Sequence, residues 1–90
     1  MHLARGLVEA DLVACVNILP GVRSIYRWQG AVEDGAEVLM MVKTLPEHFD
    51  GVERWLMEHH PYDVPEVVGI RADKVSDPYM RWIEESVTHQ

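Results

Sequence analysis

Two adjacent histidines, His59 and His60, have the most specific chemistry in this sequence. Imidazole nitrogens are the commonest protein ligands for copper and zinc at neutral pH. Neighbouring helical residues point about 100° apart, so this pair shares one ion only if the helix unwinds at Pro61. The alternative packs His59 on a helix stripe and leaves His60 in solvent or bonded to the helix end. Because a transition-metal site needs three or four ligands, this alternative is slightly favoured on the residues alone.

The other potentially reactive residues, Lys43 and Cys15, are each explained by a structural role. Lys43 shares a predicted strand face with Leu39 and Met41, so its ammonium group needs solvent or an anion, and an ion pair with Glu66 is the simplest reading. Cys15 alternates with apolar residues, which favours a small buried hydrophobe over a copper ligand or nucleophile. Phosphate-binding glycine loops, CxxC pairs, HExxH and Ser-His-Asp arrangements are absent. We therefore predict that the protein is not an enzyme.

The aromatic residues form a larger set than so small a core can hide. Core packing accounts for most of them, but the two on the predicted hairpin are equally compatible with an interface or ligand cleft. We therefore treat Trp28 as a candidate interface residue. The set is Tyr26, Trp28, Trp55, Tyr62, Tyr79 and Trp82.

Length and net charge limit the classes of molecule that can be partners. Ninety residues with 48% hydrophobic and 26% charged residues predict one domain, residues 1–90, whose small core would gain from oligomerisation. A net charge of -7 has the wrong sign for a nucleic-acid backbone. The aliphatic run Val38–Val42 is far shorter than the roughly 18 residues of a membrane span. A single cysteine cannot form an internal disulfide, so we expect a soluble, cytoplasmic protein.

The elements that must position these residues follow from hydrophobic periodicity. Apolar residues between Leu3 and Leu12 recur at helical spacing and predict a first helix. From Ala14 the period changes to two, which predicts a strand. Pro20-Gly21 interrupts this strand, which we expect to kink there and to resume as Val22–Gln29.

The strand is expected to turn back on itself at Gln29-Gly30, because both residues tolerate the positive φ of a tight turn. A two-residue turn there places Ile18 opposite Met41, so that two apolar strands pair along their length. The second turn signal, Asp34-Gly35, then becomes a bulge. The returning strand is predicted as Glu37–Thr44.

The second half of the chain contains two further helices and a strand. Thr44–Glu47 reads as a capping box with proline in the first turn, and the helix that it begins stops at His60-Pro61. Val64–Ile70 is rich in β-branched residues and predicts a strand, and Asp77-Pro78 caps a last helix. The order α-β-β-α-β-α predicts an α+β sandwich with helices on one face of an antiparallel sheet.

Several segments together carry a family resemblance. They are residues 12–21 (LVACVNILPG), 24–30 (SIYRWQG), 42–44 (VKT), 59–62 (HHPY), 64–66 (VPE) and 77–79 (DPY) with Trp82. In this order and spacing they cover essentially the whole chain and resemble the CutA divalent-cation tolerance proteins. No single segment would be sufficient.

The resemblance implies a ferredoxin-like subunit in a homotrimer, similar in architecture to the nitrogen-regulatory PII proteins, with the hairpin reaching into a neighbour. It implies tolerance of copper and other divalent cations, the paired histidines being a proposed Cu²⁺ or Zn²⁺ site, and no catalysis. The positions that line the cleft between subunits correspond to Tyr26, Lys43, His59, Tyr62 and Glu66. An alternative is a PII-like regulator or scaffold that binds a small anion or metabolite in this cleft.

One departure from the family pattern concerns the sheet. Family members begin with a β-strand that lies between the strands corresponding to Glu37–Thr44 and Val64–Ile70, whereas this sequence starts within the first helix. Either the sequence is truncated, or these two strands close the gap, as antiparallel topology permits. We expect gap closure.

Overall fold

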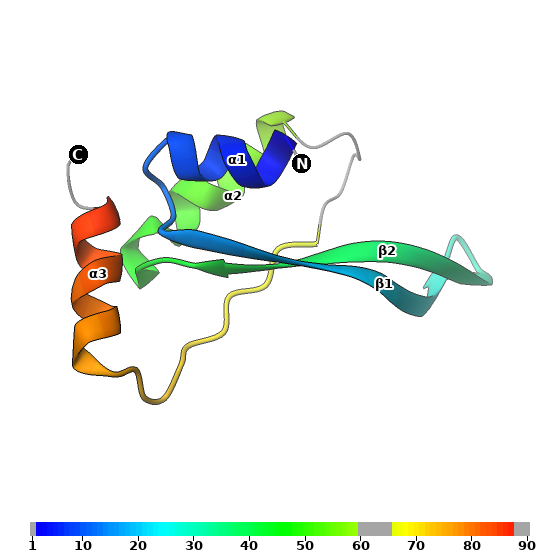
Figure 1. Ribbon diagram of the computed structural model, residues 1–90. Helices are drawn as coiled ribbons and strands as arrows, with labels where there is room; N and C mark the ends of the chain where they lie inside the picture. Colours follow the sequence, from blue (N-terminus) through cyan, green and yellow to red (C-terminus); the bar gives the residue numbers. More distant parts are fainter. Residues whose placement is uncertain (1, 60–65, 88–90) are drawn as a thin grey trace.

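A long β-hairpin is the central element of the computed structural model, which describes residues 2–59 and 66–87. Helices α1 and α2 lie on the same side of the hairpin, and α3 stands at the end where the first strand begins and the second ends (Figure 1). The elements are α1 (His2–Glu9), β1 (Cys15–Trp28), β2 (Ala31–Lys43), the 3₁₀ helix η1 (Pro46–His48), α2 (Phe49–His59) and α3 (Asp77–Val87).

The predicted hairpin turn is confirmed. Trp28 pairs with Ala31 across the two-residue turn Gln29-Gly30. Both turn residues have positive φ, 50° for Gln29 and 85° for Gly30, which is the left-handed conformation that type I′ hairpin turns require. A turn of this type matches the right-handed twist of the flanking strands, so β1 and β2 remain paired from the turn to Cys15 and Lys43.

The predicted bulge is in the wrong strand. Gly35 pairs regularly with Ser24, and the register shifts instead between Leu19 and Val22, so Ile18 lies opposite Met40 rather than Met41. Pro20-Gly21 supplies the extra residue because proline lacks the N–H that a ladder needs and Gly21 has a φ of 78°. Since β2 has no interruption, it extends over Ala31–Lys43 instead of beginning at Glu37.

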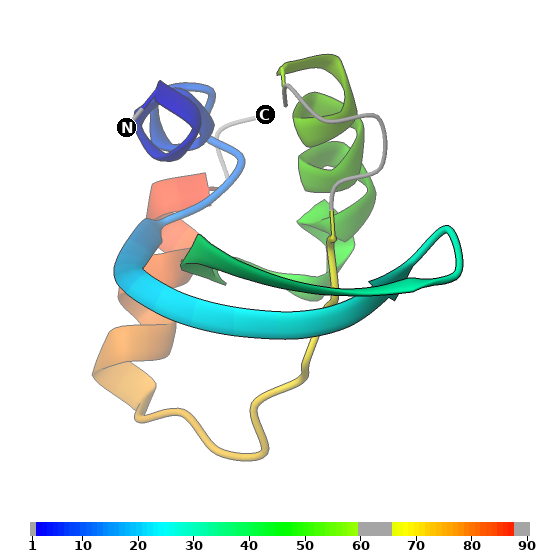
Figure 2. The same ribbon diagram turned by 90° about the vertical axis from the view of Figure 1, so that its right-hand side faces the viewer.

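The predicted strand Val64–Ile70 does not form in its described part, residues 66–70. Within the described residues the sheet has two strands, so gap closure against β2 is also wrong. Val68 and Ile70 are 70% and 89% exposed. Strand propensity expresses how well a side chain packs on a pleated surface, and in the described residues neither β1 nor β2 forms a ladder with this segment. Residues 66–76 instead run past the hairpin to α3 (Figures 1 and 2).

Helix ends also differ from the sequence predictions. Helix α1 ends at Glu9 because Asp11 has a φ of 59° and the Leu12 amide donates to the Leu7 carbonyl, a Schellman-type closure. The capping box is not formed: the Thr44 hydroxyl donates to the Leu12 carbonyl at 2.7 Å. Leu45 occupies the N-cap of η1 without a side-chain bond. At α3 the Met80 amide donates to the Ser76 carbonyl, so the helical bonding begins one residue before Asp77.

Two clusters form the core. The first joins α1 and α2 through Leu7, Val13, Val52 and Leu56, and the helix-facing strand residues pack against it. The second, Leu45, Ile83 and Val87, attaches α3 to the end of the hairpin. No helix among residues 2–59 and 66–87 is long and apolar enough to cross a membrane.

An exposed ion pair links the two strands of the hairpin, and it predicts that the stability of the hairpin depends on pH. Arg23 donates two hydrogen bonds to Asp34, at 2.9 and 2.6 Å, and this lowers the pKa of the Asp34 carboxyl. Since the folded pKa lies below the unfolded one, the stabilisation is present above the unfolded pKa and is lost as pH falls through the folded value. We expect an NMR titration of the Asp34 carboxyl to move to higher pH in Arg23→Gln. An unchanged titration would show that the pair does not persist in solution.

Candidate functional site

His59 is the last residue of α2, and its imidazole is held by Trp55, one helical turn earlier. The Nδ1 atom donates to the Trp55 carbonyl oxygen at 2.7 Å, since that oxygen can only accept. The two rings are stacked, with centroids 3.9 Å apart and planes inclined by 14°. His59 is exposed, and its packing is confined to this stack on the Trp55 ring. Its Nε2 atom retains a lone pair that can bind a metal ion.

The remaining members of the predicted metal and cleft site are only partly described. His60 and Tyr62 lie outside the described residues. No group of three or more His, Cys, Asp or Glu residues close enough to hold one ion occurs within residues 2–59 and 66–87. The described part of the chain therefore supplies one well-placed donor, His59, and any complete site needs ligands from elsewhere.

Tyr26 and Lys43 lie on the same face of the hairpin, the one turned away from the helices. Tyr26 pairs with Glu33, and because β2 is unbroken, Glu33 and Lys43 are on one face. The opposite face carries Met40 and Val42, which pack against the helical core. The sequence prediction that places Lys43 on a cleft-forming surface with Tyr26 is compatible with this register.

Lys43 is partly buried and donates a hydrogen bond to the Asn17 side-chain oxygen. The structural ion pair expected with Glu66 is not formed: the described part of the chain gives Lys43 no carboxylate within ion-pair distance. Glu66 is exposed in the irregular segment after α2. Cys15, which pairs with Lys43 across the strands, is a free thiol of intermediate exposure rather than fully buried.

The helix-free face also carries an uncovered apolar stripe. Leu19 and Leu39 pair directly, and Met41 follows two residues along β2; they are 38%, 44% and 49% exposed. Towards the turn, Tyr26 and Trp28 are 47% and 55% exposed. Several large apolar residues exposed on one face are typical of an interface in soluble proteins. Helices α1 and α2 lie on the opposite side of the hairpin (Figure 1).

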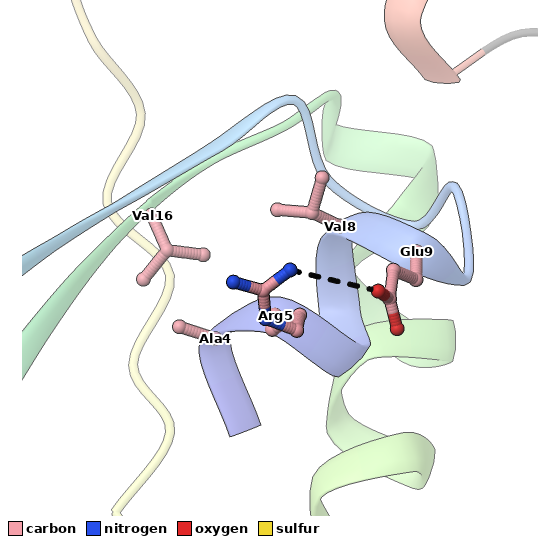
Figure 3. A pocket seen from close by; sticks show the side chains of 5 residues that line it. All are labelled: Ala4, Arg5, Val8, Glu9 and Val16. Atoms are coloured by element: carbon pink, nitrogen blue, oxygen red, sulfur yellow. Dashed lines mark ion pairs between the residues drawn. The ribbon is translucent and has the colours of Figure 1, made fainter. Parts of the chain in front are cut away.

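A hollow that the sequence did not predict lies between α1 and β1. Its volume is about 290 Å³, and Ala4, Val8 and Val16 form its apolar wall (Figure 3). Arg5 and Glu9, 3.9 Å apart, form an exposed ion pair at its edge. None of the predicted site residues lines it. With one exposed carboxylate it offers no metal site, and we assign it no function.

Comparison with known proteins assigns residues 1–86 to one family. The family model described as "CutA1 divalent ion tolerance protein" matches residues 1–86. The chain is similar to a Protein CutA homolog from Xenopus laevis, with 40% identity over 85 residues, covering 94% of this chain and 56% of that protein. It is similar to mouse Protein CutA at 39% identity, covering 93% of this chain and 48% of the mouse protein. The chain thus spans about half the length of these curated relatives.

Solved structures show the same likeness. The divalent cation tolerance protein Cut A1 from Thermus thermophilus superposes with a TM-score of 0.92 at 42% identity, covering 96% of this chain and 84% of that one. CutA1 from Oryza sativa gives a TM-score of 0.94 at 35% identity, covering 99% and 82%. These neighbours have a ferredoxin-like α+β fold, so the predicted fold class is confirmed although the sheet in the described residues has two strands.

Proposed function

Because the chain belongs to the CutA1 divalent ion tolerance family, we propose that it binds a divalent cation, Cu²⁺ or Zn²⁺, through His59 and His60 and works as a homotrimer. The family is named for cation tolerance and not for a reaction, which supports a binding role over catalysis. Residues 1–90 act as a single domain. We propose that the protein works in the cytoplasm. A relative from Arabidopsis thaliana is named chloroplastic, and a structure from Archaeoglobus fulgidus is described as periplasmic.

The observation that carries the metal proposal is the orientation of His59. Its Nδ1–H is used by the Trp55 carbonyl, so the neutral ring presents Nε2 as its only ligand atom. A metal-bound imidazole ordinarily donates its other nitrogen to a carbonyl or carboxylate, and His59 already has this arrangement. The donor is therefore of the right kind. Its partners are His60 and groups contributed by a neighbouring subunit.

The proposed trimer is supported by the apolar residues that a single chain leaves exposed. The apolar stripe Leu19, Leu39 and Met41 and the exposed aromatics Tyr26 and Trp28 lie on the helix-free face. A hairpin is marginally stable in water unless further strands or helices cover its apolar side. Closed rings of identical subunits bury such faces without leaving an open edge for further growth. In this arrangement Trp28 contacts a neighbouring subunit.

Calorimetry with Cu²⁺ on the wild type and on the double variant His59→Ala/His60→Ala tests the site. Loss of two imidazole ligands is expected to weaken binding by about a hundredfold or more, since loss of outer-shell partners alone costs 10–100-fold. His48→Ala is the matched control because His48 lies at the other end of the helical segment, in η1, and should bind as the wild type does. Equal affinity of the double variant and the wild type would contradict the assignment.

A second candidate function is suggested by Lys43. Its charge is met in the described structure by a neutral amide, Asn17, on the face that carries Tyr26. A cation in this position can hold a small anion or metabolite in a cleft between subunits, for which the sequence also predicts Tyr62 and Glu66. The same calorimeter distinguishes the two proposals: heat on titrating inorganic phosphate, lost in Lys43→Gln and kept in the histidine variant, would favour the anion cleft.

A further inference from the structure

We propose that Trp55 is a positioning residue that fixes the tautomer and orientation of His59, so that the imidazole meets a metal ion through Nε2 alone. This inference rests on the metal site proposed above. It concerns a residue that the sequence analysis placed only among the aromatic set, and it assigns Trp55 no direct contact with the ion.

Two contacts from the same residue restrain the imidazole. The Trp55 carbonyl accepts the Nδ1–H of His59 at 2.7 Å, which fixes the proton on that nitrogen. The Trp55 indole stacks on the imidazole at 3.9 Å with a tilt of 14°, which fixes the plane of the ring. Residues four apart on a helix lie one above the other, so both contacts arise within α2 itself. His59 is exposed, and without these contacts its ring would rotate freely.

Trp55 is in turn held by α1. A Cβ atom added at Gly6 would lie 2.6 Å from two atoms of the Trp55 six-membered ring, well inside van der Waals contact. The indole is therefore packed directly on the backbone of α1, beside the buried residue Leu7. This packing makes the indole a rigid platform between the helical core and His59. A larger residue at position 6 would displace the platform.

The chemical consequence is pre-organisation of one ligand atom. A neutral imidazole with its proton on Nδ1 can bind a metal only through Nε2, and a fixed ring plane sets the direction of that lone pair. Ordering the ring before binding removes part of the entropic cost of coordination. The Trp55 indole thus affects metal affinity only through His59. Its loss is expected to weaken metal binding although every ligand remains.

The tautomer is tested first, without metal. Long-range ¹H–¹⁵N NMR spectra of the metal-free protein at pH 8 report which nitrogen carries the proton, and a His59→Gln variant identifies the signals. Both Trp55→Phe and Trp55→Leu keep the main-chain carbonyl, but only Trp55→Phe keeps a ring that can hold the imidazole against it. We therefore expect the Nδ1–H form in the wild type and in Trp55→Phe, and a mixture of tautomers in Trp55→Leu. Tyr79→Leu, which breaks the Tyr79–Trp82 ring pair on α3, is the matched control and should leave His59 unchanged. An Nε2–H form in the wild type, or no change in Trp55→Leu, overturns the proposal.

Affinity for Zn²⁺ is tested second, by calorimetry on the same proteins. Trp55→Leu is expected to weaken binding about tenfold, the lower end of outer-shell effects, and Trp55→Phe to stay near the wild type. Wild-type affinity in Trp55→Leu overturns the positioning role. Absence of Zn²⁺ binding in the wild type overturns the proposed function, while the NMR result still decides whether Trp55 orders the ring.

Discussion

Replacing Leu7 with alanine is expected to lower the free energy of unfolding by about 3 kcal/mol, within the range for buried leucines. Leu7 is fully buried and belongs to the cluster that joins α1 to α2. Its side chain cannot be replaced from solvent, so truncation leaves a cavity where the two helices meet. Small domains have about 5–15 kcal/mol of total stability, so this loss is a large fraction of the whole.

Val8→Ala is the matched control for this change. Val8 is the next residue on the same helix, loses a similar aliphatic side chain, and is 41% exposed. Its effect should stay below about 1 kcal/mol because little transfer energy and no cavity are involved. Urea denaturation followed by circular dichroism measures both variants. Equal destabilisation by the two changes would mean that α1 is not packed on α2 as described.

The parts of the fold that sequence predicts well are those determined by neighbouring residues. The turn at Gln29-Gly30 was predictable because few residue pairs tolerate two positive φ values. The bulge was not, because Pro20-Gly21 and Asp34-Gly35 are both plausible interruptions. Once the two strands are paired, the bulge falls in the strand that lacks a hydrogen-bond donor. Pro20 has no N–H, so the bulge lies in β1.

Elements that depend on distant partners were predicted less well. The β-branched run after α2 has the composition of a strand, yet residues 66–70 form none, since a ladder partner is a property of the whole sheet. Thr44 has the sequence context of a helix cap, but its hydroxyl finds the Leu12 carbonyl, 32 residues earlier, in the assembled core. Neither outcome is encoded in the local pattern.

The candidate site shows the same division. His59 was identifiable from residue type, and its stacking on Trp55 could have been recognised from the four-residue spacing on a predicted helix. The contact of Trp55 with Gly6 could not, because it joins two helices 49 residues apart in the chain. Lys43 was expected to pair with Glu66 by charge alone, whereas the cross-strand register brings Asn17 within its reach instead.

The second large effect concerns assembly. Light scattering is expected to give the wild type three times the mass of the 10.3 kDa chain, and Leu39→Glu is expected to give the mass of one chain. Leu39 lies in the centre of the apolar stripe on the helix-free face and is 44% exposed in a single chain. A carboxylate there meets water in the monomer but is desolvated in the proposed trimer, at a cost of several kcal/mol for each of the subunits. The added carboxylate therefore destabilises the trimer and not the folded single chain.

Val38→Glu separates assembly from a general effect of adding charge to β2. Val38 precedes Leu39 in the same strand, is 47% exposed, and by strand alternation points to the other face of the hairpin. Both variants therefore gain the same charge at the same place along the strand, and only Leu39→Glu places it on the stripe. A trimer that survives Val38→Glu and dissociates in Leu39→Glu assigns the interface to the helix-free face. Dissociation of both, or of neither, would place the interface elsewhere on the chain.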